Sequence, residues 1–254
     1  MNQNNFFTMP FASIWIEKIF LYLNMKELFM FRSVSRDCFS LVHEHFRCLK
    51  FLDCFKSNIH SPYMLNIVLK KNTKLQSLNL QNVKWITPDE LAKIALNFDL
   101  CYLNLSSSFY LNYSAFCCFN LNNLKILILK HCHWIDKDIW NKIIDDCQQI
   151  QEIILTGCWT LDESDIQILF QKHGSKLKTV SLEDIFSVND LTLTSIAQNA
   201  NVLNVLNLKG CWRITAEGLK KLSNIKTLRR IYLDPCSRAS LLSYRELIDF
   251  GIEI

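Results

Sequence analysis

The feature that most constrains the fold is a spaced pattern of leucines that recurs through most of the chain. Its clearest copy runs from Leu203 to Thr215 and reads L-x-x-L-x-L-x-x-C-x-x-I-T, with leucines at positions 1, 4 and 6 and cysteine at position 9. Alternating apolar residues in so short a segment are typical of a strand with one buried face. Each copy must therefore bury that face against something else, and the nearest partners are the other copies.

The pattern occurs seven times at a nearly constant period. Position 1 of the seven copies is Leu75, Leu100, Leu124, Ile150, Leu177, Leu203 and Leu228, so that successive starts differ by 25, 24, 26, 27, 26 and 25. A weaker copy begins at Leu49, one further period before the first. A period of about 20–29 residues with this spacing is typical of leucine-rich repeats, in which terminal repeats are atypical because they cap the stack.

A second register lies at position 13, where every copy has a side chain that can cap a helix. In the first copy, Thr87 is followed by proline and then by Glu90, which together predict a capping box. We therefore predict an α/β leucine-rich-repeat solenoid over residues 49–254, with a curved parallel sheet on the concave face and helices on the convex face. Position 13 is occupied in turn by Thr87, Asn112, Asp136, Asp162, Asn189, Thr215 and Ser240.

The N-terminal part of the chain lacks the repeat. We expect residues 1–8 to be a disordered leader and residues 9–48 to form a separate helical domain. Most side chains between Met9 and Val42 are hydrophobic, and the segment Ile14–Leu23 is apolar on nearly all sides. About 40 residues cannot cover so much apolar surface by themselves. We expect one face to pack on the first repeat and another to be open to a partner.

Within this segment, a proline, an Ile-Phe helix and the triplet Val34-Ser35-Arg36 follow one another at the spacing of an F-box. Met9 stands where leucine is usual, and Ala12 where glutamate is frequent. Residues 9–254 as a whole resemble the F-box/leucine-rich-repeat family. The resemblance implies adaptor contact, or support of that contact, at Pro10, Ile14, Ile19, Phe20, Leu23, Leu28 and Val34, although Ile19, Leu23 and Val34 could instead face the internal core.

The resemblance also implies a function. Such proteins are non-catalytic substrate-recognition subunits of Skp–cullin–F-box ubiquitin ligases. Their F-box binds a Skp-type adaptor, and through it a cullin scaffold and a RING subunit, while the repeats hold a protein substrate for ubiquitination and degradation. The alternative is a stand-alone leucine-rich-repeat scaffold or inhibitor, in which the N-terminal helices only cap the solenoid.

The concave face is the first candidate surface for a substrate. Positions 3, 5 and 7 point outward there, and most of them are polar. Ile126, Ile128 and Ile154 are exceptions on adjacent repeats, so we expect them to contact the substrate unless flanking side chains cover them. The predicted substrate-binding residues are Tyr102, Ile126, Ile128, Lys130, Glu152, Ile154, Val205 and Tyr232.

Tryptophans just beyond the strands mark a second candidate surface. Trp85, Trp134, Trp159 and Trp212 occupy position 10 or 11 of their repeats. Tryptophan is frequent in binding hot spots, but it also stacks in the core of repeat proteins. The stacked core is the interpretation that we favour.

Other functions find little support in the sequence. It contains no nucleophile elbow, zinc-protease motif or phosphate-binding loop, so we expect no enzyme activity and no cofactor. His43, His45 and Cys48, and likewise His131 and His133, are histidine clusters that we do not expect to hold a metal, because neighbouring residues on a strand face opposite ways.

Charge and cysteine content limit the partners and the compartment. The net charge of +4 is mild and no block of like charges occurs, so we expect no nucleic-acid partner. No apolar run is long enough to span a membrane, and no export signal is present. Four of the eleven cysteines stand at position 9, which suits packing in a reducing compartment. We expect the protein in the cytoplasm, and the nucleus is also compatible.

Overall fold

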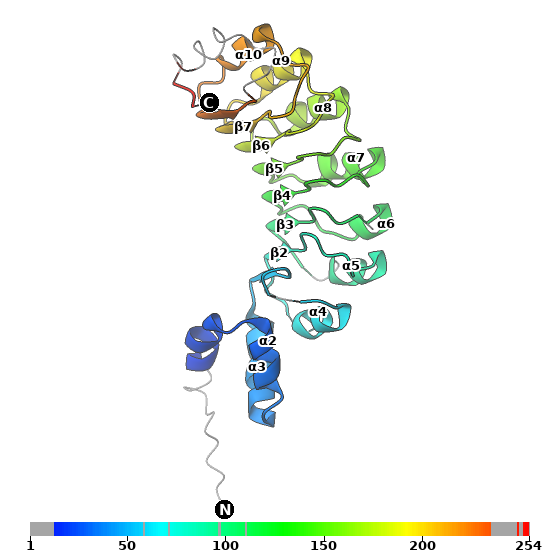
Figure 1. Cartoon of the computed structure of the whole chain (residues 1–254), viewed down its shortest axis with the longest axis vertical. Helices are drawn as coiled ribbons and strands as arrows, with labels where there is room; N and C mark the ends of the chain where they lie inside the picture. The colour runs from blue at the N-terminus through cyan, green and yellow to red at the C-terminus, as the bar shows by residue number, and fades with distance from the viewer. Residues whose placement is uncertain are drawn as a thin grey trace, which may run out of the picture.

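In a computed structural model, the chain forms a curved stack of strand–turn–helix repeats that starts from a cluster of N-terminal helices (Figure 1). The structure describes residues 13–57, 59–70, 72–95, 98–109, 111–234, 248 and 251–253. Eight strands form one parallel sheet in sequence order. They are β1 Phe51–Asp53, β2 Ser77–Asn79, β3 Tyr102–Asn104, β4 Ile126–Ile128, β5 Glu152–Ile154, β6 Thr179–Ser181, β7 Val205–Asn207 and β8 Arg230–Tyr232.

The register of the sheet follows the leucine pattern. The middle residue of each strand is position 4, and it pairs with position 4 of the next strand, as Leu78 does with Leu103 and Leu103 with Leu127. These side chains are fully buried beneath the helices, while positions 3 and 5 face out. The predicted fold class is confirmed, and the weak copy at Leu49 contributes strand β1.

The helices cover the convex face of the sheet (Figure 1). Asp136, Asp162 and Asn189 accept hydrogen bonds from backbone amides at the starts of their helices, as position 13 predicts. Thr215 does not, because its hydroxyl donates to Asp190 of the preceding repeat instead. The helices are α4 Pro62–Leu69, α5 Pro88–Ala95, α6 Tyr113–Phe116, α7 Lys137–Asp146, α8 Glu163–His173, α9 Asp190–Asn199 and α10 Ala216–Leu222.

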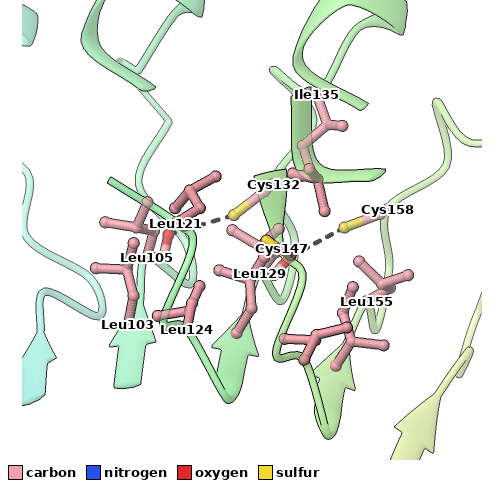
Figure 2. Packing of buried hydrophobic residues seen from close by; sticks show 14 of the residues in the cluster. Leu103, Leu105, Leu121, Leu124, Leu129, Cys132, Ile135, Cys147, Leu155 and Cys158 are labelled. Atoms are coloured by element: carbon pink, nitrogen blue, oxygen red, sulfur yellow. Dashed lines mark hydrogen bonds between the residues drawn. The ribbon is translucent and has the colours of Figure 1, made fainter. Parts of the chain in front are cut away.

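Position 9 joins each repeat to the one before it. The Cys158 thiol donates to the backbone carbonyl of Leu129, with a sulfur–oxygen distance of 2.9 Å, and Cys132 makes the same bond to Leu105 at 3.2 Å (Figure 2). Cys211 does so as well. Position 9 is buried in every full repeat in which the structure describes it; where it is cysteine the thiol adds this bond, whereas Val83 and Ile185 fill the same place without a donor.

Position 8 turns the chain away from the strand through a left-handed backbone. In six successive repeats its φ angle lies between 55° and 71°. Only glycine and a few short polar residues adopt this conformation readily. The position is occupied in turn by Asn82, Ser107, His131, Gly157, Asp184 and Gly210.

The last strand has its outer edge covered. Residues 251–253 run beside β8, where the Ile231 amide donates to the Glu253 carbonyl and the Glu253 amide donates to the Arg229 carbonyl, both at 2.8 Å. The Ile252 side chain, in the same segment, is buried against the core. Ser240, at position 13 of the last copy, lies outside the described residues.

The N-terminal helices are η1 Trp15–Ile19, η2 Phe20–Tyr22, α2 Met25–Arg32 and α3 Arg36–Cys48. The first two are one turn of π-helix followed by one of 3-10 helix. Their small core is aromatic: the Phe20 ring lies 5.6 Å from Phe31 and 5.3 Å from His45, measured between centroids. Leu28 of α2 is buried beside them.

The buried Asn72 side chain is one of the connections between these helices and the solenoid, which share a continuous hydrophobic core. The Asn72 amide group donates to the carbonyls of Phe46 and Leu49, at 2.6 and 2.9 Å. Its oxygen accepts from the backbone amides of Lys74 and Leu75, each at 2.8 Å. The end of α3 is thus bonded directly to the start of the first full repeat.

Candidate protein-interaction surfaces

The N-terminal helices present apolar side chains to solvent. Val34 is 73% exposed and Tyr22 is 87% exposed, although such residues are normally buried. Both lie at turns, Tyr22 at the end of η2 and Val34 shortly after α2. We name this the apolar N-terminal surface; its members are Ile14, Leu21, Tyr22, Met30, Val34 and Phe39.

The predicted adaptor positions divide between this surface and the core beneath it. Ile14 and Val34 are exposed, and Ile19 and Leu23 are partly buried. Phe20 and Leu28 are each only 2% exposed, so they can support a contact but cannot make one. Pro10, like the leader at residues 1–8, lies outside the described residues.

Sequence reasoning missed Leu21, Met30 and Phe39, which are also exposed. Leu21 belongs to a segment in which every face is apolar, so no helical period separates the inner side from the outer. Met30 lines a cleft of about 350 Å³ between α2 and α4, together with Lys26, Phe29, Ser33, His60 and Met64.

On the concave face, five of the predicted substrate residues come together on strands β3 to β5. Ile126 lies beside Tyr102 and Glu152 on the neighbouring strands, and Ile128 beside Ile154. All five side chains are half-buried. Burial also raises the pKa of the Glu152 carboxyl above its usual value. The isoleucines thus form a shallow patch that is partly covered by its neighbours.

The other predicted substrate residues lie apart from this patch. Val205 and Tyr232 are on β7 and β8, separated from β5 by the polar strand β6. The Lys209 ammonium lies 5.7 Å from the centre of the Tyr232 ring, beside the Arg230–Glu253 ion pair. Lys130 is exposed just beyond the end of β4.

The tryptophans do not form the stacked core that we favoured. Trp85 and Trp134, at position 11, pack against the core. Trp159 and Trp212, at position 10, are instead 61% and 54% exposed. The left-handed residue at position 8 turns the chain, so a shift of one position reverses the direction of the side chain.

Position 10 is aromatic in five successive repeats. We name these residues the aromatic rim, because they follow the edge of the sheet where the strands end. Sequence reasoning missed three of them, since it searched for tryptophan alone and not for aromatic residues at one position. The aromatic rim consists of Phe109, His133, Trp159, Phe186 and Trp212.

The strand register and the turn at position 8 together decide the architecture. It is a leucine-rich-repeat solenoid. No protein-family model matches the chain, and no curated protein matches it either.

Solved structures resemble the chain at low identity. The Rad7 and Elc1 complex in yeast matches with 14% identity over 92% of this chain and 84% of that one, with a TM-score of 0.47. The leucine-rich-repeat-containing protein LegL7 from Legionella pneumophila matches with 17% identity, coverages of 84% and 73%, and a TM-score of 0.49. An internalin, inlF, from Listeria monocytogenes matches with 16% identity, coverages of 73% and 48%, and a TM-score of 0.48.

The chemistry of the described residues is that of packing and surface contact. Burial raises the pKa of the Cys158 and Cys211 thiols to about 12, which keeps them protonated and unreactive. All ten cysteines that the structure describes are free. No group of three metal-binding side chains is found in the described ranges, and none of the helices there is long and apolar enough to cross a bilayer.

The histidine clusters have other roles. The His45 ring packs against Phe20 and Phe46, whereas the His43 ring stacks on Phe39, 4.2 Å away, and accepts a hydrogen bond from Arg32. The His131 ring covers Gly157 of the next repeat, where an added Cβ would lie 2.3 Å from Nδ1. These rings are therefore part of the packing.

Proposed function

We propose that the chain is the substrate-recognition subunit of a Skp–cullin–F-box ubiquitin ligase, working in the cytoplasm or nucleus. The observation that carries the proposal is the apolar N-terminal surface, which belongs to the segment that resembles an F-box. Six large apolar side chains between Ile14 and Phe39 are each at least 43% exposed. So many exposed large apolar side chains within one segment of 26 residues favour a protein-interaction site.

The arrangement suits a receptor. A Skp-type adaptor on the N-terminal surface would be linked to cullin and RING subunits, and the solenoid would hold a protein substrate at a fixed orientation to them. Asn72 supports that orientation, because it bonds the end of α3 to the first full repeat. The chain needs no catalytic group in this role, since it only positions the substrate.

The test is co-expression with a Skp-type adaptor, followed by light scattering and titration calorimetry. We expect a one-to-one complex. Val34→Asp places a charge in the contact and should weaken adaptor binding at least about tenfold, by the cost of desolvating an unpaired charge. Leu191→Asp is the matched control, because Leu191 is similarly exposed but lies on α9, away from this surface.

Two results would contradict the proposal. One is a soluble monomer that shows no affinity for the adaptor. The other is equal binding by Val34→Asp and Leu191→Asp. In either case the alternative, a stand-alone repeat scaffold or inhibitor, would be the better account, with the N-terminal helices as a cap.

A further inference from the structure

The aromatic rim is an exposed surface that the adaptor contact does not use. Four of its members, Phe109, Trp159, Phe186 and Trp212, are each at least 50% exposed. The fold does not need them, because positions 9 and 12 already fill the turn below, as Cys158 and Leu161 do for Trp159. Large aromatic side chains that stay in water at one position of successive repeats indicate a binding surface.

The middle rings of the aromatic rim lie next to one another and form a continuous aromatic face. The centroids of Phe109 and His133 are 6.5 Å apart, and those of His133 and Trp159 are 4.2 Å apart. In an extended chain, side chains on one face recur about every 6.6 Å. A peptide lying along the rim could therefore rest alternate side chains on this face; the 4.2 Å contact of His133 and Trp159 leaves no room for a side chain between those two rings.

The charge around the rim identifies what such a peptide would carry. In the middle three repeats, residues 130–138, 156–165 and 183–190 contain eight acidic side chains and two lysines, although the whole chain carries a net charge of +4. One of these lysines, Lys137, is already paired with Asp162 and Asp165. At the middle of the rim carboxylates therefore outnumber ammonium groups, whereas Trp212 at its end is flanked in sequence by Lys209 and Arg213.

Helix capping explains only part of this charge. Asp136 and Asp162 cap α7 and α8. Asp138 is exposed in the first turn of α7, and Asp184 lies at position 8 of the turn in its repeat. An aromatic face beside carboxylates is the combination that binds arginine and lysine, through cation–π contact and ion pairing. It repels phosphate, which makes nucleic acid a poor match.

We propose that the aromatic rim binds an extended, arginine- or lysine-containing segment of a partner protein. The cationic side chains lie on Trp159 and its neighbouring rings, and their charge is balanced by acidic residues such as Asp138 and Asp184. That this segment belongs to the substrate rests on the proposed ligase function; the binding itself does not.

The test measures fluorescence anisotropy with the full chain and three labelled probes: a decapeptide of alternating arginine and serine, the same peptide with glutamate for arginine, and a decamer of oligouridine. We expect saturable binding of the arginine peptide, at least about tenfold tighter than that of either other probe. Trp159→Ala should weaken it at least about fivefold, and Asp138→Asn should weaken it less. Phe55→Ala, another exposed aromatic that lies beyond β1, should have no effect.

Equal affinity for the three probes, tighter binding of oligouridine, or unchanged affinity in Trp159→Ala would each overturn the proposal. So would self-association of the chain that Trp159→Ala abolishes, since the occupant would then be a second copy. Thermal unfolding of each variant checks that the fold is intact. Val34→Asp separates the two proposals, because it should lose the adaptor and keep the arginine peptide.

Discussion

Position 9 shows how one small side chain determines the contact between neighbouring repeats. Its cysteine fills the turn and donates to a carbonyl of the preceding repeat, and in the second repeat Ser108 makes the same bond to Leu80, with an oxygen–oxygen distance of 3.4 Å. Because burial raises the pKa of these thiols and keeps them protonated, the donor hydrogen is present at any physiological pH.

Cys158→Ala should lower the free energy of unfolding by about 1–3 kcal/mol, because it opens a small cavity and removes the shorter of two hydrogen bonds to the Leu129 carbonyl, which keeps only the 3.3 Å bond from the Cys132 amide. Cys158→Ser should cost less, since serine already occupies this position in the second repeat. Urea unfolding measures both. Cys48→Ala, at a partly exposed site, is the control, and equal losses for alanine and serine would argue against the hydrogen bond.

The sequence predicts the burial of position 9 well. It predicts poorly which way the side chains at positions 10 and 11 point. A buried cysteine there follows from the leucine spacing, but the carbonyl that it reaches lies 29 residues earlier and depends on the stacking of two repeats. The tryptophans at positions 10 and 11 differ by a single step along the repeat. Both repeats have the left-handed turn at position 8, and after it position 11 packs inward, as Trp134 does, while position 10 stays exposed, as Trp159 does.

At the scale of elements, the strands were the most predictable part, because period and register repeat together. The helices were less predictable than the strands. The second repeat has the shortest period, and its helix α6 is only one turn long. The first N-terminal helix became π and 3-10 turns, which no pattern in its sequence indicated.

The connection between α3 and the repeats supports a second prediction. Asn72→Ala removes an amide that makes four hydrogen bonds in a buried site, and should lower the free energy of unfolding by about 3 kcal/mol. Asn72→Asp should also destabilise, because the carboxylate cannot donate to the Phe46 and Leu49 carbonyls. Differential scanning calorimetry measures the loss. Asn66→Ala, at an exposed site on α4, is the control.

If Asn72 connects the N-terminal helices to the solenoid, its loss should also change the order in which these two parts unfold. Hydrogen exchange in Asn72→Ala should show α3 losing protection before the central strands do. Protection that falls equally along the whole chain would contradict a role at the junction and indicate a general loss of stability.

At the scale of the whole molecule, two buried histidines make stability depend on pH. Burial lowers the pKa of His45 in the N-terminal core and of His173 in α8, whose Nε2 hydrogen bonds the Ile144 carbonyl at 2.7 Å. The unfolded chain, with histidine pKa values of about 6.5, takes up protons first. Stability is therefore complete above about pH 6.5 and is lost as the pH falls through the lower pKa values of the folded state.

The free energy of unfolding should thus fall as the pH is lowered from about 7.5 to about 5, as measured by urea unfolding at each pH. His173→Gln keeps a donor for Ile144 and removes the titration, so its stability should fall less steeply. His60→Gln changes an exposed histidine and should leave the slope as it is. Identical slopes in all three proteins would show that His173 does not govern the response.

The C-terminal end of the stack differs from its middle, because a short tail covers the edge of the last strand. This has a consequence for handling the protein. Residues 251–253 occupy the hydrogen-bonding edge of β8, a place where an incoming strand from another molecule could otherwise add. Proteolytic removal of these residues would open the β8 edge, so that two trimmed molecules could pair through it. A higher molar mass of the trimmed protein in light scattering would be the sign of this pairing.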